Sequence, residues 1–132
     1  ASAGVQMDLI IRTTYAMLPH KNIRAISILD RYLEHQRIYV FGRDEDRVVL
    51  MSSADLMERN LDWRVEVAFP ILDRRLQEEV VHMMELQVAD QYKARILDET
   101  QCNQYAGEGK GEMGAQYATY LFFKELAEAA DQ

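Results

Sequence analysis

Residues 37–51 read RIYVFGRDEDRVVLM, two apolar runs separated by a charged hexapeptide. β-Branched and aromatic residues are common in these runs, as is typical of strands. Between the runs, a glycine followed by five charged residues (42–47) favours a polar turn. The stretch therefore predicts a β-hairpin with strands over Arg37–Phe41 and Val48–Met51.

Further strands are predicted on both sides of this hairpin. Val5–Arg12 alternates loosely and is rich in β-branched residues, and Trp63–Phe69 alternates with Arg64 and Glu66 on one face. The apolar positions of residues 23–33 fit neither the strand period nor the helix period. Residues 52–61 open on Ser-Ser-Ala-Asp, which suits the cap of a short helical turn.

The second half of the chain is predicted to be helical. Asp73 suits an N-cap, and apolar residues then recur at helical spacing at positions 76, 80, 83, 84 and 88. The GEGKGEMG segment (107–114) fails the P-loop pattern and is predicted to be a hinge. An aromatic helix, for the core or a subunit interface, is expected over 115–130. Strands followed by packing helices predict an α/β fold, with a mixed β-sheet flanked by helices and a helical C-terminal part.

The composition limits the class of protein. A length of 132 residues with 48% hydrophobic residues suits a single domain over 1–132 with its own core. The net charge is −7, and an acidic chain argues against a protein that coats nucleic acid. No apolar run approaches the roughly 20 residues of a membrane helix. The lone Cys102 fits a reducing, intracellular setting, and a start without Met predicts a piece of a longer protein.

Charge is unevenly distributed along the chain. Residues 67–132 hold six basic and twelve acidic residues, whereas residues 1–66 hold nine basic residues, eight of them arginine. Arginine forks match the oxygens of phosphate groups. A local arginine cluster in an acidic chain favours a pocket for anions, with solvated ion pairs as the alternative.

The three histidines differ in context. His82 falls opposite the apolar stripe of its predicted helix and is expected to be solvated, and His20 follows Pro19 in a loop. His35 stands at the start of a predicted strand, two residues before Arg37. Downstream of it come Ser52, Ser53 and Asp55 in the SSAD turn, then Arg59-Asn60, then Glu66.

This order resembles the half-site of the phospholipase D superfamily, in which a His-x-Lys motif precedes a serine-rich turn. Phosphoryl transfer spreads charge over the equatorial oxygens of phosphorus. A histidine can attack the phosphorus or protonate its leaving group, and a cation with hydroxyls can stabilise the charge. Spacing alone leaves a catalytic His35 and a structural one equally open.

Longer motifs resemble the bacterial polyphosphate kinase family from about Val5 to the end. They are NIRAISILDRYLEHQRIYVF (22–41), SSADLMERNLDWRVEV (52–67) and ADQYKAR (89–95), followed by a closing helix that begins near Gln116. The resemblance implies the second phospholipase D-like domain of an enzyme that reversibly transfers the terminal phosphate of ATP to polyphosphate. It further implies a phosphohistidine in the preceding domain and homo-oligomers in the cytoplasm, with membrane association left open.

The resemblance also implies roles for individual residues. His35 matches the family's second active-site histidine, which serves ATP binding and proton transfer, and Arg12 matches its nucleotide-binding arginine. Arg37 is expected to hold phosphate charge. Ser52, Ser53 and Asp55 would shape the turn, and Glu66 would orient the histidine, a role that the wider phospholipase D superfamily implies. Mg²⁺ is expected as cofactor, with ligands outside these residues and no metal ligand among them.

Two alternatives stay open. The first is a phosphodiesterase or nuclease of the phospholipase D type, in which a dimer would bring two copies of His35 together. The second is a non-catalytic oligomerisation module that self-associates through residues 117–126.

Overall fold

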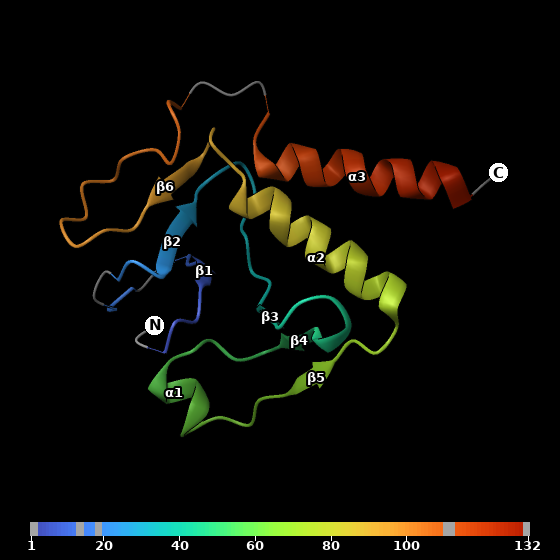
Figure 1. Ribbon diagram of the computed structural model, residues 1–132, viewed down its shortest axis with the longest axis horizontal. Coiled ribbons are helices and arrows are strands. Elements are labelled where there is room, and N and C mark those ends of the chain that lie inside the picture. The colour runs from blue at the N-terminus through green and yellow to red at the C-terminus, as the bar shows by residue number, and fades with distance from the viewer. Residues whose placement is uncertain (1–2, 13–14, 18–19, 110–112, 131–132) are drawn as a thin grey trace. The chain divides into compact units, whose positions relative to one another are not determined.

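The computed structural model describes residues 3–12, 15–17, 20–109 and 113–130 (Figure 1). The chain folds as two compact units. The first unit comprises Ala1–Glu34 and Met83–Gln132, and the second comprises His35–His82. None of the helices in the described ranges combines the length and hydropathy that a bilayer span requires.

The first unit is built on a three-stranded sheet in the order β1-β2-β6. Strand β1 (Met7–Ile10) runs parallel to β2 (Ile23–Ile28), and β2 runs antiparallel to β6 (Ala94–Ile96). The core of this unit lies on β2, where Ile26 and Ile28 pack with Ala94 and Ala115. This mixed sheet with helices confirms the predicted α/β class.

Burial explains why residues 23–33 matched neither period. The last four residues of β2, from Ala25 to Ile28, are all buried, so both faces of the strand are covered. A strand covered on both faces shows no alternation. Leu29, directly after it, is 69% exposed. Strand β6 was missed because three residues are too few to show a period.

Asp90 joins the loop before β6 to the last helix, α3 (Ala115–Ala130). Its Oδ1 accepts the backbone N–H groups of Tyr92, Lys93 and Ala94 at 2.8, 2.6 and 3.1 Å. Its Oδ2 accepts the N–H of Ala115 at 2.6 Å, in the first turn of α3. The helix occupies the predicted range, and this buried carboxylate holds its start on the core. Residues 110–112 of the predicted hinge lie outside the described residues.

The second unit contains the predicted hairpin, extended to a three-stranded antiparallel sheet. Strand β3 (Ile38–Phe41) pairs with β4 (Val48–Ser52), and β4 pairs with β5 (Ala68–Pro70). A 3₁₀ turn, η1 (Asp44–Asp46), closes the hairpin after Gly42, whose φ is +73°. A Cβ at Gly42 would lie 2.6 Å from the carbonyl oxygen of Asp46, so this turn requires glycine.

The strand prediction for Trp63–Phe69 is wrong over most of its length. Of that range only Ala68 and Phe69 pair with β4, as part of β5. Trp63 is 80% exposed and Val65 fully exposed, so the alternating residues 63–67 cover no sheet face. Alternation indicates a strand only where one of its faces is buried.

The two helices that follow the hairpin along the chain differ in how their predicted caps compare with the structure. Helix α1 (Glu58–Leu61) begins after Met57 without a side-chain cap, so the expected capping by Ser52, Ser53 or Asp55 is wrong. Helix α2 (Arg74–Val88) begins as predicted. The boundary between the two units falls within it, after His82. Asp73 Oδ1 accepts the N–H groups of Arg75 and Leu76 at 2.8 and 3.2 Å.

The apolar stripe of α2 is only partly covered. Leu76 is 45% exposed, whereas Gln77 and Gln87 are buried. Gln77 can be buried because its amide donates to the carbonyl of Ile71 at 2.6 Å and accepts from Arg74 at 3.1 Å. His82 on α2 is exposed, as predicted.

Candidate functional site

The hairpin explains how residues seventeen positions apart come together. His35 and Arg37 precede β3, and the SSAD turn starts at the last residue of β4. Because the two strands are antiparallel neighbours, the start of β3 lies beside the end of β4. The N–H of Ser52 donates to the carbonyl of Arg37 at 2.9 Å and closes this end of the ladder.

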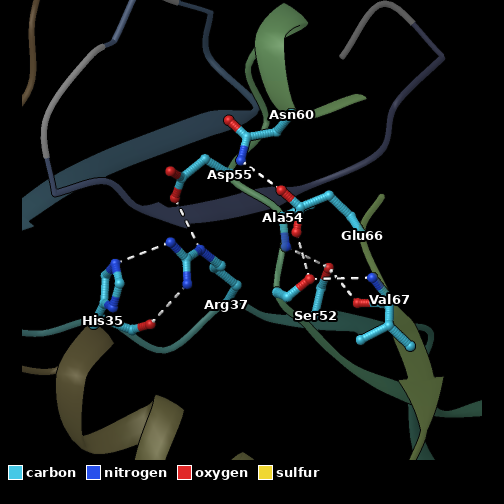
Figure 2. Close-up of polar contacts among 9 residues, drawn as sticks. His35, Arg37, Ser52, Ala54, Asp55, Asn60, Glu66 and Val67 are labelled. Atoms are coloured by element: carbon cyan, nitrogen blue, oxygen red, sulfur yellow. Dashed lines mark hydrogen bonds and ion pairs between the residues drawn. The ribbon is translucent and has the colours of Figure 1, made fainter. Parts of the chain in front are cut away.

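Arg37 lies between an imidazole and a carboxylate (Figure 2). Its Nε donates to Oδ1 of Asp55 at 2.8 Å, and its Nη2 lies 2.9 Å from Nε2 of His35. Its Nη1 reaches the backbone carbonyl of His35 at 3.5 Å. Donation to Asp55 raises the pKa of the Arg37 guanidinium, against the opposing effect of burial. The guanidinium is therefore a fixed cation beside the histidine ring.

The two serines fasten the turn to the segment before β5. Ser52 Oγ donates to the carbonyl of Val67 at 3.2 Å and accepts the N–H of Ala54 at 3.1 Å. Ser53 Oγ accepts the N–H of Val67 at 3.1 Å and donates to Oε2 of Glu66. Both hydroxyls thus hydrogen-bond within the turn and to the segment before β5, and their supporting role in the site stays a prediction.

Glu66 is held on two sides. Besides the Ser53 hydroxyl, it accepts the amide of Asn60 at 2.8 Å through Oε1. Hydrogen bonding from Ser53, then from Asn60, lowers the pKa of the Glu66 carboxyl. Its hydrogen bonds in the described residues go to these two side chains, whereas the side chain that contacts the His35 ring is Arg37. The predicted orientation of His35 by Glu66 would therefore have to act indirectly, through the SSAD turn.

Arg12 belongs to the first unit. It lies two residues after β1, half-buried, and Ile11 before it donates its N–H to the carbonyl of Ile26. The other predicted site residues all lie in the second unit: His35, Arg37, Ser52, Ser53, Asp55 and Glu66. Proximity between Arg12 and His35 stays a prediction.

Sequence reasoning gave too little weight to two residues of this cluster. Asn60 is 2% exposed and anchors Glu66 from α1. Tyr39, the second residue of β3, is half-buried, and burial raises the pKa of its hydroxyl. A buried asparagine six positions before a glutamate has no distinctive sequence signal, and an aromatic residue in a strand suggests packing alone.

Comparison with known proteins gives a consistent assignment. The family model described as polyphosphate kinase C-terminal domain 2 matches residues 1–116. The polyphosphate kinases of Salmonella typhimurium and Escherichia coli strain K12 are 43% and 42% identical to the chain, over 96% of it. In the crystal structure of polyphosphate kinase from Porphyromonas gingivalis, the matching part is 38% identical with a TM-score of 0.90, again over 96% of this chain.

These matches cover a small part of each relative. The chain spans 19% of the length of the two curated proteins and 20% of the chain in the crystal structure. They confirm the family that the motifs indicated and the α/β fold. The chain belongs to the polyphosphate kinase C-terminal domain 2 family.

Proposed function

We propose that this chain is one part of a polyphosphate kinase active site, in an enzyme that reversibly transfers the terminal phosphate of ATP to polyphosphate. The observation that carries the proposal is the Arg37 guanidinium held between the His35 ring and the Asp55 carboxylate. In this proposal residues 1–132 act as a single domain, the second of two phospholipase D-like domains. Family membership supports ATP and polyphosphate as the substrates.

Arg37 would bind the transferring phosphoryl group. Charge in that transition state is spread over the equatorial oxygens, and a cation fixed in advance stabilises it without reorganising. Asp55 accepts from Nε of the guanidinium, whereas the Nη groups contact His35, and these Nη groups would turn to the phosphate oxygens when substrate binds. Arg12 would supply a second cation for the nucleotide phosphates.

His35 would donate a proton to the leaving group of the phosphoryl transfer. An imidazole titrates near neutral pH and can donate to the oxygen that leaves phosphorus. Glu66, Ser52 and Ser53 would act through the turn that carries Asp55. The attacking group in this proposal is a histidine of the preceding domain, which becomes the phosphohistidine.

Mg²⁺ is a further expectation from the family. Within the described residues, no three His, Cys, Asp or Glu side chains gather as a metal site would need. The family resemblance leads us to expect the Mg²⁺ ligands elsewhere in the enzyme. We propose a cytoplasmic homo-oligomer, with contacts to the preceding domains of the same chain.

The intact protein that carries this chain provides the test. Incubation with ATP and Mg²⁺ should yield acid-insoluble polyphosphate, and ADP with polyphosphate should yield ATP. Hydrolysis of bis(p-nitrophenyl) phosphate without polyphosphate synthesis would instead assign a phospholipase D-type phosphodiesterase.

A non-catalytic module would give neither product. It would also lack a melting shift with a non-hydrolysable ATP analogue, because only a ligand that binds the folded state raises its stability. Either of these outcomes would overturn the kinase proposal.

A further inference from the structure

We propose that Arg37 fixes the tautomer of His35: in the absence of substrate, the ring carries its proton on Nδ1, and its Nε2 lone pair accepts from the guanidinium until a phosphate oxygen takes over that donor. The proposal makes Arg37 a positioning residue for the histidine as well as a phosphate ligand. Its second half, the exchange with phosphate, rests on the proposed function.

The chemistry of the two side chains sets the direction of this hydrogen bond. A guanidinium has five N–H donors and no acceptor. The 2.9 Å separation between Arg37 Nη2 and His35 Nε2 is therefore a hydrogen bond only if Nε2 has its lone pair free. A proton on Nε2 would set two donors against each other beside a fixed positive charge.

The other contacts of Arg37 hold its guanidinium in the position that keeps a proton off Nε2 of His35. Asp55 accepts from Nε at 2.8 Å, and the carbonyl of His35 lies 3.5 Å from Nη1 (Figure 2). The Arg37 side chain is 20% exposed and that of Asp55 27%, so water competes only in part for this ion pair, whereas the contact with His35 is exposed. Which imidazole nitrogen carries the proton depends on the hydrogen bond that the other nitrogen makes. Here that bond is to Arg37, and the proton is left to Nδ1.

A phosphate group can replace His35 as the partner of Arg37 Nη2 while the ion pair with Asp55 stays intact. Phosphate oxygens are charged acceptors and bind a guanidinium more strongly than a neutral imidazole does. Asp55 would retain Nε while Nη2 changes partner from His35 to phosphate, so the cation stays in place. The Nε2 atom of His35 then becomes free in the same event that brings the substrate.

The released ring can then serve the transfer. Nε2 takes a proton from a hydronium ion of the solvent, which becomes water, and the ring becomes an imidazolium with both nitrogens protonated. As the histidine of the preceding domain forms its bond to phosphorus, the bond between phosphorus and the ADP oxygen breaks. The electron pair of that bond stays on the ADP oxygen, which accepts the Nε2 proton. The ring returns to the neutral form with its proton on Nδ1, and the net result at this residue is the transfer of one solvent proton to the ADP oxygen.

Magic-angle-spinning ¹⁵N NMR tests the proposal on the intact protein that carries this chain. Protonated and unprotonated imidazole nitrogens resonate far apart, and the method has no size limit. The protein is labelled with ¹⁵N in its histidine rings, and His35 is identified by subtracting the spectrum of His35→Gln. We expect a protonated Nδ1 and an unprotonated Nε2 for His35, and a change at Nε2 when inorganic tripolyphosphate is added.

Two variants complete the design. Arg37→Gln should move the proton of His35 toward Nε2, the site that free neutral histidine favours. Arg43→Gln, an exposed arginine in the hairpin turn of the same unit, should leave the His35 signals unchanged. A proton on Nε2 in the unliganded parent protein would overturn the inference without help from any variant. So would an unchanged tautomer in Arg37→Gln.

The same samples separate this inference from the proposed function. If the protein makes no polyphosphate but His35 carries its proton on Nδ1, the kinase proposal is wrong and the proposed tautomer is supported. If the protein synthesises polyphosphate at the full rate but His35 carries its proton on Nε2, the kinase proposal is supported and the proposed tautomer is wrong.

Discussion

Arg37 donates from Nε to Oδ1 of Asp55 over 2.8 Å, an ion pair between residues eighteen positions apart in the sequence. It joins the residue before β3 to the turn after β4. Both side chains are mostly covered, so solvent screens the attraction only in part. The position of the cation beside His35 is thus set by Asp55.

Asp55→Asn tests this role. Asparagine keeps an oxygen acceptor for Nε but loses the charge, and charge-assisted hydrogen bonds are about twice as strong as neutral ones. We expect ATP-dependent polyphosphate synthesis by the intact protein to fall about tenfold, with little change in the melting temperature. Asp62→Asn, an exposed position after α1, is the matched control. Parental rates in Asp55→Asn would show that the ion pair is dispensable.

The Glu66 carboxyl makes stability depend on pH in the acid range. Its pKa is lowered from the ordinary value of 4.5 by the donors of Ser53 and Asn60. Its contribution to folding is therefore complete above pH 4.5 and is lost as the pH falls through the lower pKa of the folded state.

Urea unfolding between pH 7 and pH 3 measures this contribution. Glu66→Gln should lose stability at pH 7 and show a shallower decline toward acid than the parent protein. Glu78→Gln, at an exposed position on α2, should decline as the parent does. If the free energy of unfolding of Glu66→Gln falls with pH in parallel with that of the parent, the Glu66 carboxylate does not cause the pH dependence.

The N-cap of α2 makes a local contribution to stability. Asp73 accepts two N–H groups of the first turn, which Asp73→Ala would leave without a protein partner. We expect Asp73→Ala to lower the free energy of unfolding by about 1 kcal/mol, measured by chemical denaturation. Asp73→Ser, which restores a capping oxygen, should recover most of the loss. Equal stability in Asp73→Ala and the parent would argue against the cap.

Gln116 is expected to hold the segment that leads to His35. Its amide donates to the Tyr32 carbonyl at 2.7 Å and to Glu34 at 2.8 Å, and it accepts the Tyr32 N–H at 3.0 Å. Each such bond contributes about 1 kcal/mol. In Gln116→Ala, amide hydrogen exchange at Tyr32 should therefore accelerate by roughly one to two orders of magnitude. Glu125→Ala, exposed on the same helix, should not change it.

Local sequence signals predicted the parts of this fold that depend on local chemistry. The hairpin followed from two apolar runs around Gly42, the start of α2 from Asp73, and α3 from its composition. The predictions failed where tertiary burial decides. Strand β2 is buried on both faces, and its sequence therefore shows no alternation of apolar and polar residues. Residues 63–67 do alternate, but their apolar side chains are exposed and pack against no sheet.

The same distinction applies to the candidate site. The predicted hairpin accounts for the proximity of His35, Arg37 and the SSAD turn, because it places the start of β3 beside the end of β4. The partners of Glu66 were not predictable, because they depend on how the loop between α1 and β5 folds back. Arg12 was assigned by family resemblance alone, and its distance from His35 stays a prediction.

In the proposed function, His35 acts in phosphate transfer. The decisive measurement is the rate of polyphosphate synthesis from ATP in the intact protein carrying His35→Gln, beside His82→Gln as an exposed histidine on α2. The account predicts a loss of about 10²- to 10⁴-fold for His35→Gln, with an unchanged melting temperature, and parental rates for His82→Gln. Near-parental synthesis by a folded His35→Gln protein would contradict it.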